Sequence, residues 1–167
     1  MTTKLVMYSY NSRKFLSFMR QPAFIKFWFV PLWISLGFAK ILIFLVSFKI
    51  IAPYLGVNLG LSPPVSFLLR DEEQRAILIG RAVRLAAKYT PWNSNCFPQA
   101  IVARALLGFY RIPYVLYFGL RLASTAAELE AHAWVCAGKV SVTGGTSFDR
   151  FTIVGVFASG PITTRSA

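Results

Sequence analysis

The clearest pattern of apolar and polar positions lies between residues 95 and 108. Apolar side chains recur at three- and four-residue intervals, as in a helix with one buried face, at Ile101, Val102, Ala105, Leu106 and Phe109. Pro98 suits only the first turn of such a helix, because proline lacks an amide hydrogen and has a fixed φ. The pattern therefore predicts a helix that begins at Cys96.

One predicted helix precedes this cysteine helix and several predicted strands follow it. Asp71, Glu72 and Glu73 open the earlier helix, and its expected inner face consists of Ala76, Ile77, Gly80, Val83 and Ala87. Runs typical of strands cover residues 114–121, 131–137, 139–143 and 150–157, with a hairpin turn at Gly138. This order predicts an α+β fold in which an antiparallel sheet packs on the cysteine helix.

The N-terminal part of the chain is an apolar segment. From Phe27 to Phe48 it is apolar apart from Lys40 and two serines, and 22 such residues are long enough to span a bilayer. Lys40 and the early Pro31 argue against a simple span. Three arrangements stay open: helices packed on the rest of the chain, helices lying on a membrane surface, or a span.

These segments predict the domain organisation. Residues 1–69 form an apolar helical segment with basic flanks and a linker, residues 70–160 form the folded domain, and residues 161–167 form a tail.

Composition and charge narrow the classes of partner. The apolar fraction of 56% exceeds the about 45–50% of ordinary soluble domains. A net charge of +12 favours anionic lipid, nucleic acid or an acidic peptide, but the cations are too scattered for a nucleic-acid site. Two cysteines make no secreted disulfide framework, so free thiols in the cytoplasm are expected, with no metal or cofactor.

Cys96 and His132 are the candidate catalytic residues. A thiol at a helix start lies next to unpaired backbone amides and the positive end of the helix dipole. His132, the sole histidine, follows 36 residues later, and this pair is typical of a cysteine nucleophile site. Cys96 would be the nucleophile, His132 the base and then the acid, and the amides of Cys96 and Phe97 the oxyanion donors.

The strand that carries His132 leaves other chemistry open. Its alternation places Glu130, His132, Trp134 and Cys136 on one face, and Ala131, Ala133 and Val135 on the other. Because Cys136 shares the face of His132, a Cys96–Cys136 disulfide or a metal pair are alternatives.

An ordered set of motifs resembles a known family. The motifs are W-x-x-x-C-x-P-x-A from Trp92, R-x-L-L from Arg104, Ile-Pro at 112–113, A-H-A-W-V at 131–135, V-T-G-G at 142–145 and R-F-T at 150–152. In this order they resemble the transglutaminase-like leader peptidases of lasso-peptide biosynthesis, over residues 71–158.

The resemblance implies a papain/transglutaminase-like fold and a Cys-His-Asp hydrolase. Such an enzyme removes the leader from a ribosomally made precursor peptide, and an asparagine-synthetase-like cyclase then closes a macrolactam on the freed amine. The chain looks like the stand-alone peptidase half, which implies a separate leader-binding recognition protein. Trp92 and Trp134 are the candidates for the substrate cleft.

One departure concerns the third catalytic residue. The family's acid often lies twelve residues after the histidine, and this position is Gly144 here. Asp149 is the sole carboxylate after His132, so either Asp149 orients His132 or a backbone carbonyl does. Glu130, on the face of His132, is a further candidate. Two other functions stay open: an acyl or amide transferase on the same scaffold, and an inactive membrane-associated binding protein.

Overall fold

The computed structural model describes residues 18–61, 67–122, 129–145 and 148–159. Its helices are α2 (Ala23–Leu45), α3 (Phe48–Ile51), α4 (Arg70–Lys88) and α5 (Cys96–Phe109), with short 3-10 helices η1 (Ala52–Tyr54) and η2 (Phe148–Arg150). Its strands are β1 (Val57–Asn58), β2 (Val115–Leu122), β3 (Leu129–Ala137), β4 (Val140–Thr143) and β5 (Thr152–Ala158). The predicted cysteine helix and the hairpin at Gly138 are confirmed.

The five strands form one antiparallel sheet in the order β1-β5-β2-β3-β4. Strand β3 pairs with β2 over residues 129–136, whereas β4 pairs only with residues 135–137 of β3. Among the described strands, the segment of β3 around His132 therefore has a neighbour on one side only.

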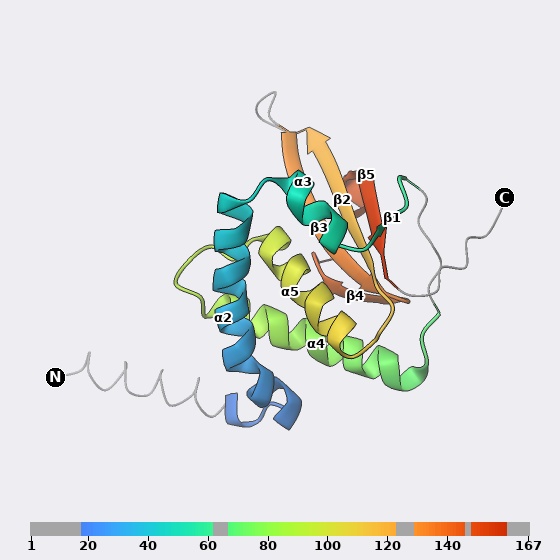
Figure 1. Ribbon diagram of the computed structural model, residues 1–167. Helices are drawn as coiled ribbons and strands as arrows, with labels where there is room; N and C mark the ends of the chain where they lie inside the picture. Colours follow the sequence, from blue (N-terminus) through green and yellow to red (C-terminus); the bar gives the residue numbers. More distant parts are fainter. Residues whose placement is uncertain (1–17, 62–66, 123–128, 146–147, 160–167) are drawn as a thin grey trace.

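Helices cover one face of this sheet. Helix α5 lies against β3, α4 runs beneath α5 against β4, and α2 crosses the ends of both (Figure 1). The apolar N-terminal helix thus packs on the same layer as the cysteine helix. The predicted α+β class, with an antiparallel sheet packed on the cysteine helix, is confirmed.

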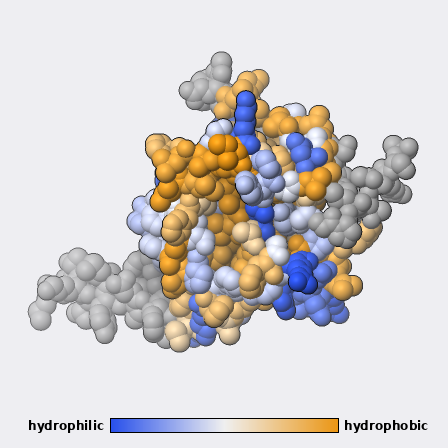
Figure 2. Space-filling view, in the orientation of Figure 1, coloured by the Kyte–Doolittle hydropathy of each residue, from blue (hydrophilic) through white to orange (hydrophobic). Residues whose placement is uncertain are grey.

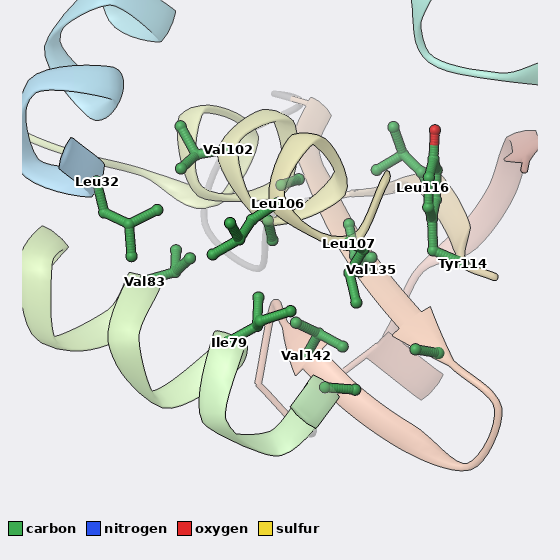
Figure 3. Packing of buried hydrophobic residues seen from close by; sticks show 14 of the residues in the cluster. Leu32, Ile79, Val83, Val102, Leu106, Leu107, Tyr114, Leu116, Val135 and Val142 are labelled. Carbon is green, nitrogen blue, oxygen red and sulfur yellow. The ribbon is translucent and has the colours of Figure 1, made fainter. Parts of the chain in front are cut away.

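One apolar core joins the helices to the sheet. Figure 3 shows side chains from four kinds of element converging: Leu32 of α2, Ile79 and Val83 of α4, Leu106 and Leu107 of α5, and Val135 and Val142 of the β3–β4 hairpin. Helix α2 contributes its inner face, which consists of the buried residues Ile25, Leu32, Leu36 and Ala39. By length and composition α2 could also cross a membrane.

The orientation of α4 differs from the predicted one. Ile77, expected on the inner face, is 47% exposed, and Ile79 is buried in its place. Ala76, Gly80 and Val83 are buried as predicted, and α4 approaches β4 closely, since a Cβ added to Gly80 would lie 2.5 Å from the carbonyl oxygen of Val142. One turn later Arg84 donates a hydrogen bond of 2.6 Å to the same oxygen. The buried side of α4 is therefore centred nearer Ile79 and Ala82 than predicted.

Candidate functional site

Cys96 is the first residue of α5, and the backbone donors beside it are free. The N-cap residue Asn95 makes no side-chain hydrogen bond to the helix. Within the described part of the chain, the amides of Cys96 and Phe97 have no acceptor, and Pro98 has no amide hydrogen. The half-buried thiol therefore lies next to two unpaired N–H donors at the positive end of the helix dipole.

The turn before α5 is fixed by its own polar side chains. The Thr90 hydroxyl lies within hydrogen-bond distance of the carbonyl oxygens of Ala87, at 2.8 Å, and Trp92, at 2.9 Å, and lies 2.9 Å from the Ser94 hydroxyl. Gln99, in the first turn of α5, donates to the carbonyl oxygen of Ser94 at 2.7 Å. Small polar residues that bond to nearby backbone favour such turns over a longer helix. These bonds hold the helix start, and with it Cys96, in place.

The imidazole of His132 is held by a backbone carbonyl. Its Nε2 lies 2.8 Å from the carbonyl oxygen of Gly144. A carbonyl can only accept, so Nε2 carries the proton of the neutral ring, and Nδ1 is left as the acceptor. The ring also stacks on Phe151 at 4.8 Å and on Trp134 at 5.8 Å between centroids. Both contacts restrict how the ring turns.

Gly144 occupies the position at which the resembling family often has its acid. Its φ is +92°, a conformation that favours glycine, and a Cβ there would lie 2.2 Å from the Cβ of Trp134. The loop therefore presents a main-chain oxygen where no side chain fits. Of the two ways to orient His132 that the sequence left open, the described geometry contains the backbone carbonyl.

Cys96 and His132 line the same pocket, which has a volume of about 320 Å³. Its wall is almost wholly apolar and consists mainly of Phe48, Phe97, Phe118, Leu120, Ala131, Ala133 and Val154. A larger hollow, of about 510 Å³, lies between α2 and α5 and contains neither residue. The smaller pocket is the candidate active site because it holds the reactive side chains.

The two catalytic candidates approach this pocket from different sides of β3. Cys96 packs against the core on the helix side. By the alternation of the strand, Ala133 and Val135 enter that core, whereas His132 and Trp134 lie on the opposite face. No hydrogen bond joins Cys96 to His132 in the described structure. The structure thus brings the pair to one pocket without direct contact.

The two carboxylates near His132 have other surroundings. Glu130 accepts from Arg121 of the neighbouring strand, with Nη2 at 2.6 Å and Nε at 2.7 Å from Oε2. Asp149 is exposed in η2, and no hydrogen bond or ion pair between it and His132 occurs among the described residues. Neither acid therefore contacts the imidazole.

The two tryptophans proposed for the substrate cleft lie elsewhere. Trp92 packs on Trp33, with centroids 5.0 Å apart, and lines a separate hollow along α2. Trp134 is 3% exposed and stacks on Tyr117 at 5.4 Å, behind the sheet. The sequence alone missed Phe48, Phe118 and Leu120 as wall residues. Strand alternation could have indicated Phe118 and Leu120, but no pattern links Phe48 to them.

The second cysteine is unsuited to nucleophilic chemistry. Cys96 and Cys136 are both free thiols. Burial raises the pKa of the Cys136 thiol to about 11, so this thiol stays neutral at ordinary pH and is a poor nucleophile. The described residues include no group of three or more metal-ligating side chains.

Comparison with known families identifies the scaffold. The model of the transglutaminase-like superfamily matches residues 42–156, which is more than half of the chain and includes Cys96, His132 and Phe48. No curated protein and no solved structure matches the chain. Membership in this superfamily indicates a hydrolase or transferase that works through a cysteine and a histidine. The chain belongs to the transglutaminase-like superfamily.

Proposed function

We propose that the chain is a cysteine peptidase that removes the leader from a ribosomally made precursor during lasso-peptide maturation. The observation that carries this proposal is the shared pocket: Cys96, beside two free amides, and His132, with one nitrogen held by Gly144, both line it. The superfamily match and the ordered motifs around both residues support it.

The reaction follows from the roles of these groups. His132 Nδ1 takes the proton of the Cys96 thiol, and the thiolate attacks the scissile carbonyl carbon. The amides of Cys96 and Phe97 donate hydrogen bonds to the oxyanion that forms. The imidazolium returns its proton to the leaving amine, which becomes the new N-terminus of the core peptide. Water then hydrolyses the thioester and gives a leader that ends in a carboxylate.

Proton transfer requires a closer approach than the structure shows. General base catalysis needs the two heavy atoms within about 3 Å of each other, and such contacts often tighten only in the Michaelis complex. Because Gly144 holds Nε2 and the ring is stacked, the approach requires a shift of β3 itself, whose described residues before Val135 have no pairing with β4. Binding of the precursor in the pocket is the step that closes this gap.

The pocket chemistry and the implied partners define the substrate. Its phenylalanine and leucine wall suits an apolar side chain next to the scissile bond. A separate leader-binding protein presents the precursor, and an asparagine-synthetase-like cyclase takes up the freed amine. This reaction takes place in the cytoplasm, where the precursor is made.

The test uses the purified full chain with a short precursor and a small leader-binding protein, which we expect neighbouring reading frames to encode. Mass spectrometry in heavy-oxygen water should find the heavy atom in the new carboxylate of the leader. Cys96→Ala should give no product and an unchanged circular dichroism spectrum. A leader amide without the heavy atom would establish a transferase instead. No product from the wild-type chain would favour the inactive binding protein, and either result overturns the proposal.

A further inference from the structure

Helix α2 carries a second apolar face that the core does not use. This outer stripe consists of Phe27, Val30, Ile34, Phe38, Ile41 and Leu45. Its residues recur every three or four positions and point away from the inner face that packs on α4 and α5. Phe27 is 72% exposed and Phe38 is 68% exposed. Figure 2 shows strongly apolar surface along the α2 side of the molecule.

The exposed apolar surface extends beyond the stripe. Phe44, near the end of α2, is 88% exposed, and Ile50 in α3 is 61% exposed. Phe38 and Leu42 also line the apolar hollow between α2 and α5. Exposed apolar side chains therefore occur on both helices, and those of α2 border a hollow. Exposed apolar patches of this kind mark interaction sites.

Cations edge this surface, and carboxylates are absent from the whole N-terminal part of the sequence. Residues 1–70 contain eight lysines and arginines and no aspartate or glutamate. Lys26 and Lys40 lie one helical turn before Val30 and Phe44, on one flank of the stripe. Lys49 is exposed next to Ile50. A complementary partner must offer both apolar and anionic groups.

We infer that the outer stripe binds the surface of a bilayer that contains anionic lipid, with α2 lying in the plane of the membrane. The apolar side chains enter the boundary between headgroups and acyl chains, and the lysines contact lipid phosphates. The inner face of α2 stays in the protein core throughout. The peptidase would thus act at the membrane surface.

Two other occupants fit the same observations less well. A transmembrane span would have to withdraw Leu32 and Leu36 from the core, where they are 2% and 0% exposed. A second copy of the chain would bring Lys26 and Lys40 near the same cations of its partner, with no carboxylate from residues 1–70 to compensate. An anionic bilayer offers acyl chains to the apolar stripe and phosphates to the lysines beside it.

Vesicle sedimentation with the full chain tests the apolar part of the inference. We expect binding to vesicles of phosphatidylcholine mixed with phosphatidylglycerol, and much weaker binding to phosphatidylcholine alone. Replacing Phe27, Phe38 and Phe44 together by serine should weaken binding on the order of a hundredfold or more, since each substitution removes an aromatic ring that the bilayer would bury. The matched control is Phe67→Ser, which removes a phenylalanine that is 84% exposed just before α4 and should not change binding.

The electrostatic part has its own variant. Lys40→Gln combined with Lys49→Gln should weaken binding to the mixed vesicles about fivefold per lysine and reduce its salt dependence. Circular dichroism checks that both variants keep the fold.

Three results would overturn the inference. The first is that the wild-type chain binds neither kind of vesicle. The second is that Phe67→Ser weakens vesicle binding as much as the triple serine variant does. The third is that the bound chain resists carbonate extraction, as a membrane-spanning protein does. If the wild-type chain forms dimers and does not bind vesicles, and the triple serine variant is a monomer, the stripe would instead be the contact with a second copy.

Discussion

The only hydrogen bond of the His132 ring among the described residues goes to a backbone carbonyl, and ring stacking adds to its orientation. In a triad a carboxylate both aligns the imidazole and stabilises its positive form. The carbonyl oxygen of Gly144 can align the ring through Nε2, but it contributes only a dipole. The carbonyl therefore aligns the imidazole as a carboxylate would, but it stabilises the positive imidazolium much less.

Gly144→Asp should not restore a triad, although it places an acid at the family position. A side chain at φ +92°, with its Cβ 2.2 Å from the Cβ of Trp134, displaces the loop. We expect a loss of about 3 kcal/mol in the free energy of unfolding and a strong loss of activity. Gly145→Asp is the control, because φ is also positive (+73°) but no atom lies within 4 Å, and it should cost about 1 kcal/mol. Higher activity in Gly144→Asp would refute the carbonyl's role.

Asp149→Asn separates the two candidates for the orienting group. The exposed Asp149 carboxylate does not contact His132 in the structure, so we expect kcat and KM within about twofold of the wild-type values. A loss of kcat of tenfold or more, with KM unchanged, would instead assign the acid's role to Asp149. The pH profile of kcat/KM in both proteins completes the comparison.

Cys136 should make the protein less stable at alkaline pH. Its thiol has a pKa raised to about 11 by burial, so the folded state keeps a proton that the unfolded state releases. The buried neutral thiol therefore contributes to the free energy of unfolding fully below the unfolded pKa, and this contribution is lost as the pH rises from about 9 to about 11. We expect a decrease on the order of 2 kcal/mol in urea unfolding over this range. Cys136→Ser should show a smaller decrease in stability over this range. Part of the decrease should remain, because burial also raises the pKa of Tyr117.

At the scale of elements, the best-predicted features are those whose signals are local. The start of α5 follows from Pro98, and the hairpin follows from Gly138, whose φ is +54°. Ala76, Gly80 and Val83 of α4 are buried as predicted, but the burial of Ile79 in place of Ile77 was missed because the elements that cover this helix meet it only in the folded chain. The contacts of Phe48 were missed for the same reason. Local patterns indicate an element, whereas its rotation and partners depend on residues far away in sequence.

Gly80→Ala should destabilise the protein, although alanine is the better helix former. The added Cβ would lie 2.5 Å from the carbonyl oxygen of Val142, so α4 must move away from β4, at a cost of about 1–3 kcal/mol. Gly108→Ala in α5 is the matched control, since nothing lies within 4 Å of its Cβ, and it should be neutral or stabilising by up to about 1 kcal/mol. Chemical denaturation of both variants checks this difference. Equal stability would show that α4 shifts freely.

At the scale of the whole molecule, α2 belongs to the folded unit. The predicted division at residue 70 stays a prediction, but the family match begins at residue 42, and α2 shares its core with α4 and α5. The sequence could show that the segment was apolar but not which face is buried, because α2 has apolar residues on both its inner and its outer face.

Leu36→Ala measures how much the packing of α2 contributes to the stability of the folded protein. Leu36 is fully buried, so we expect a loss of about 2–5 kcal/mol in the free energy of unfolding. Phe44→Ala, at a side chain that is 88% exposed, should change the same free energy by no more than about 0.5 kcal/mol in solution. Equal effects would mean that α2 is an appendage rather than part of the domain.

The strand order has a consequence for the chain during its synthesis. Strand β5, the last of the sheet, inserts between β1 and β2, and α2 packs on helices made after it. More than a hundred residues separate the end of α2 from the end of β5. At ~5–20 residues per second, α2 leaves the ribosome on the order of ten seconds before the sheet is complete. Until α4 and α5 have been made, the inner face of α2 is exposed together with the outer stripe, so we expect the nascent chain to need a chaperone or a lipid surface at that stage.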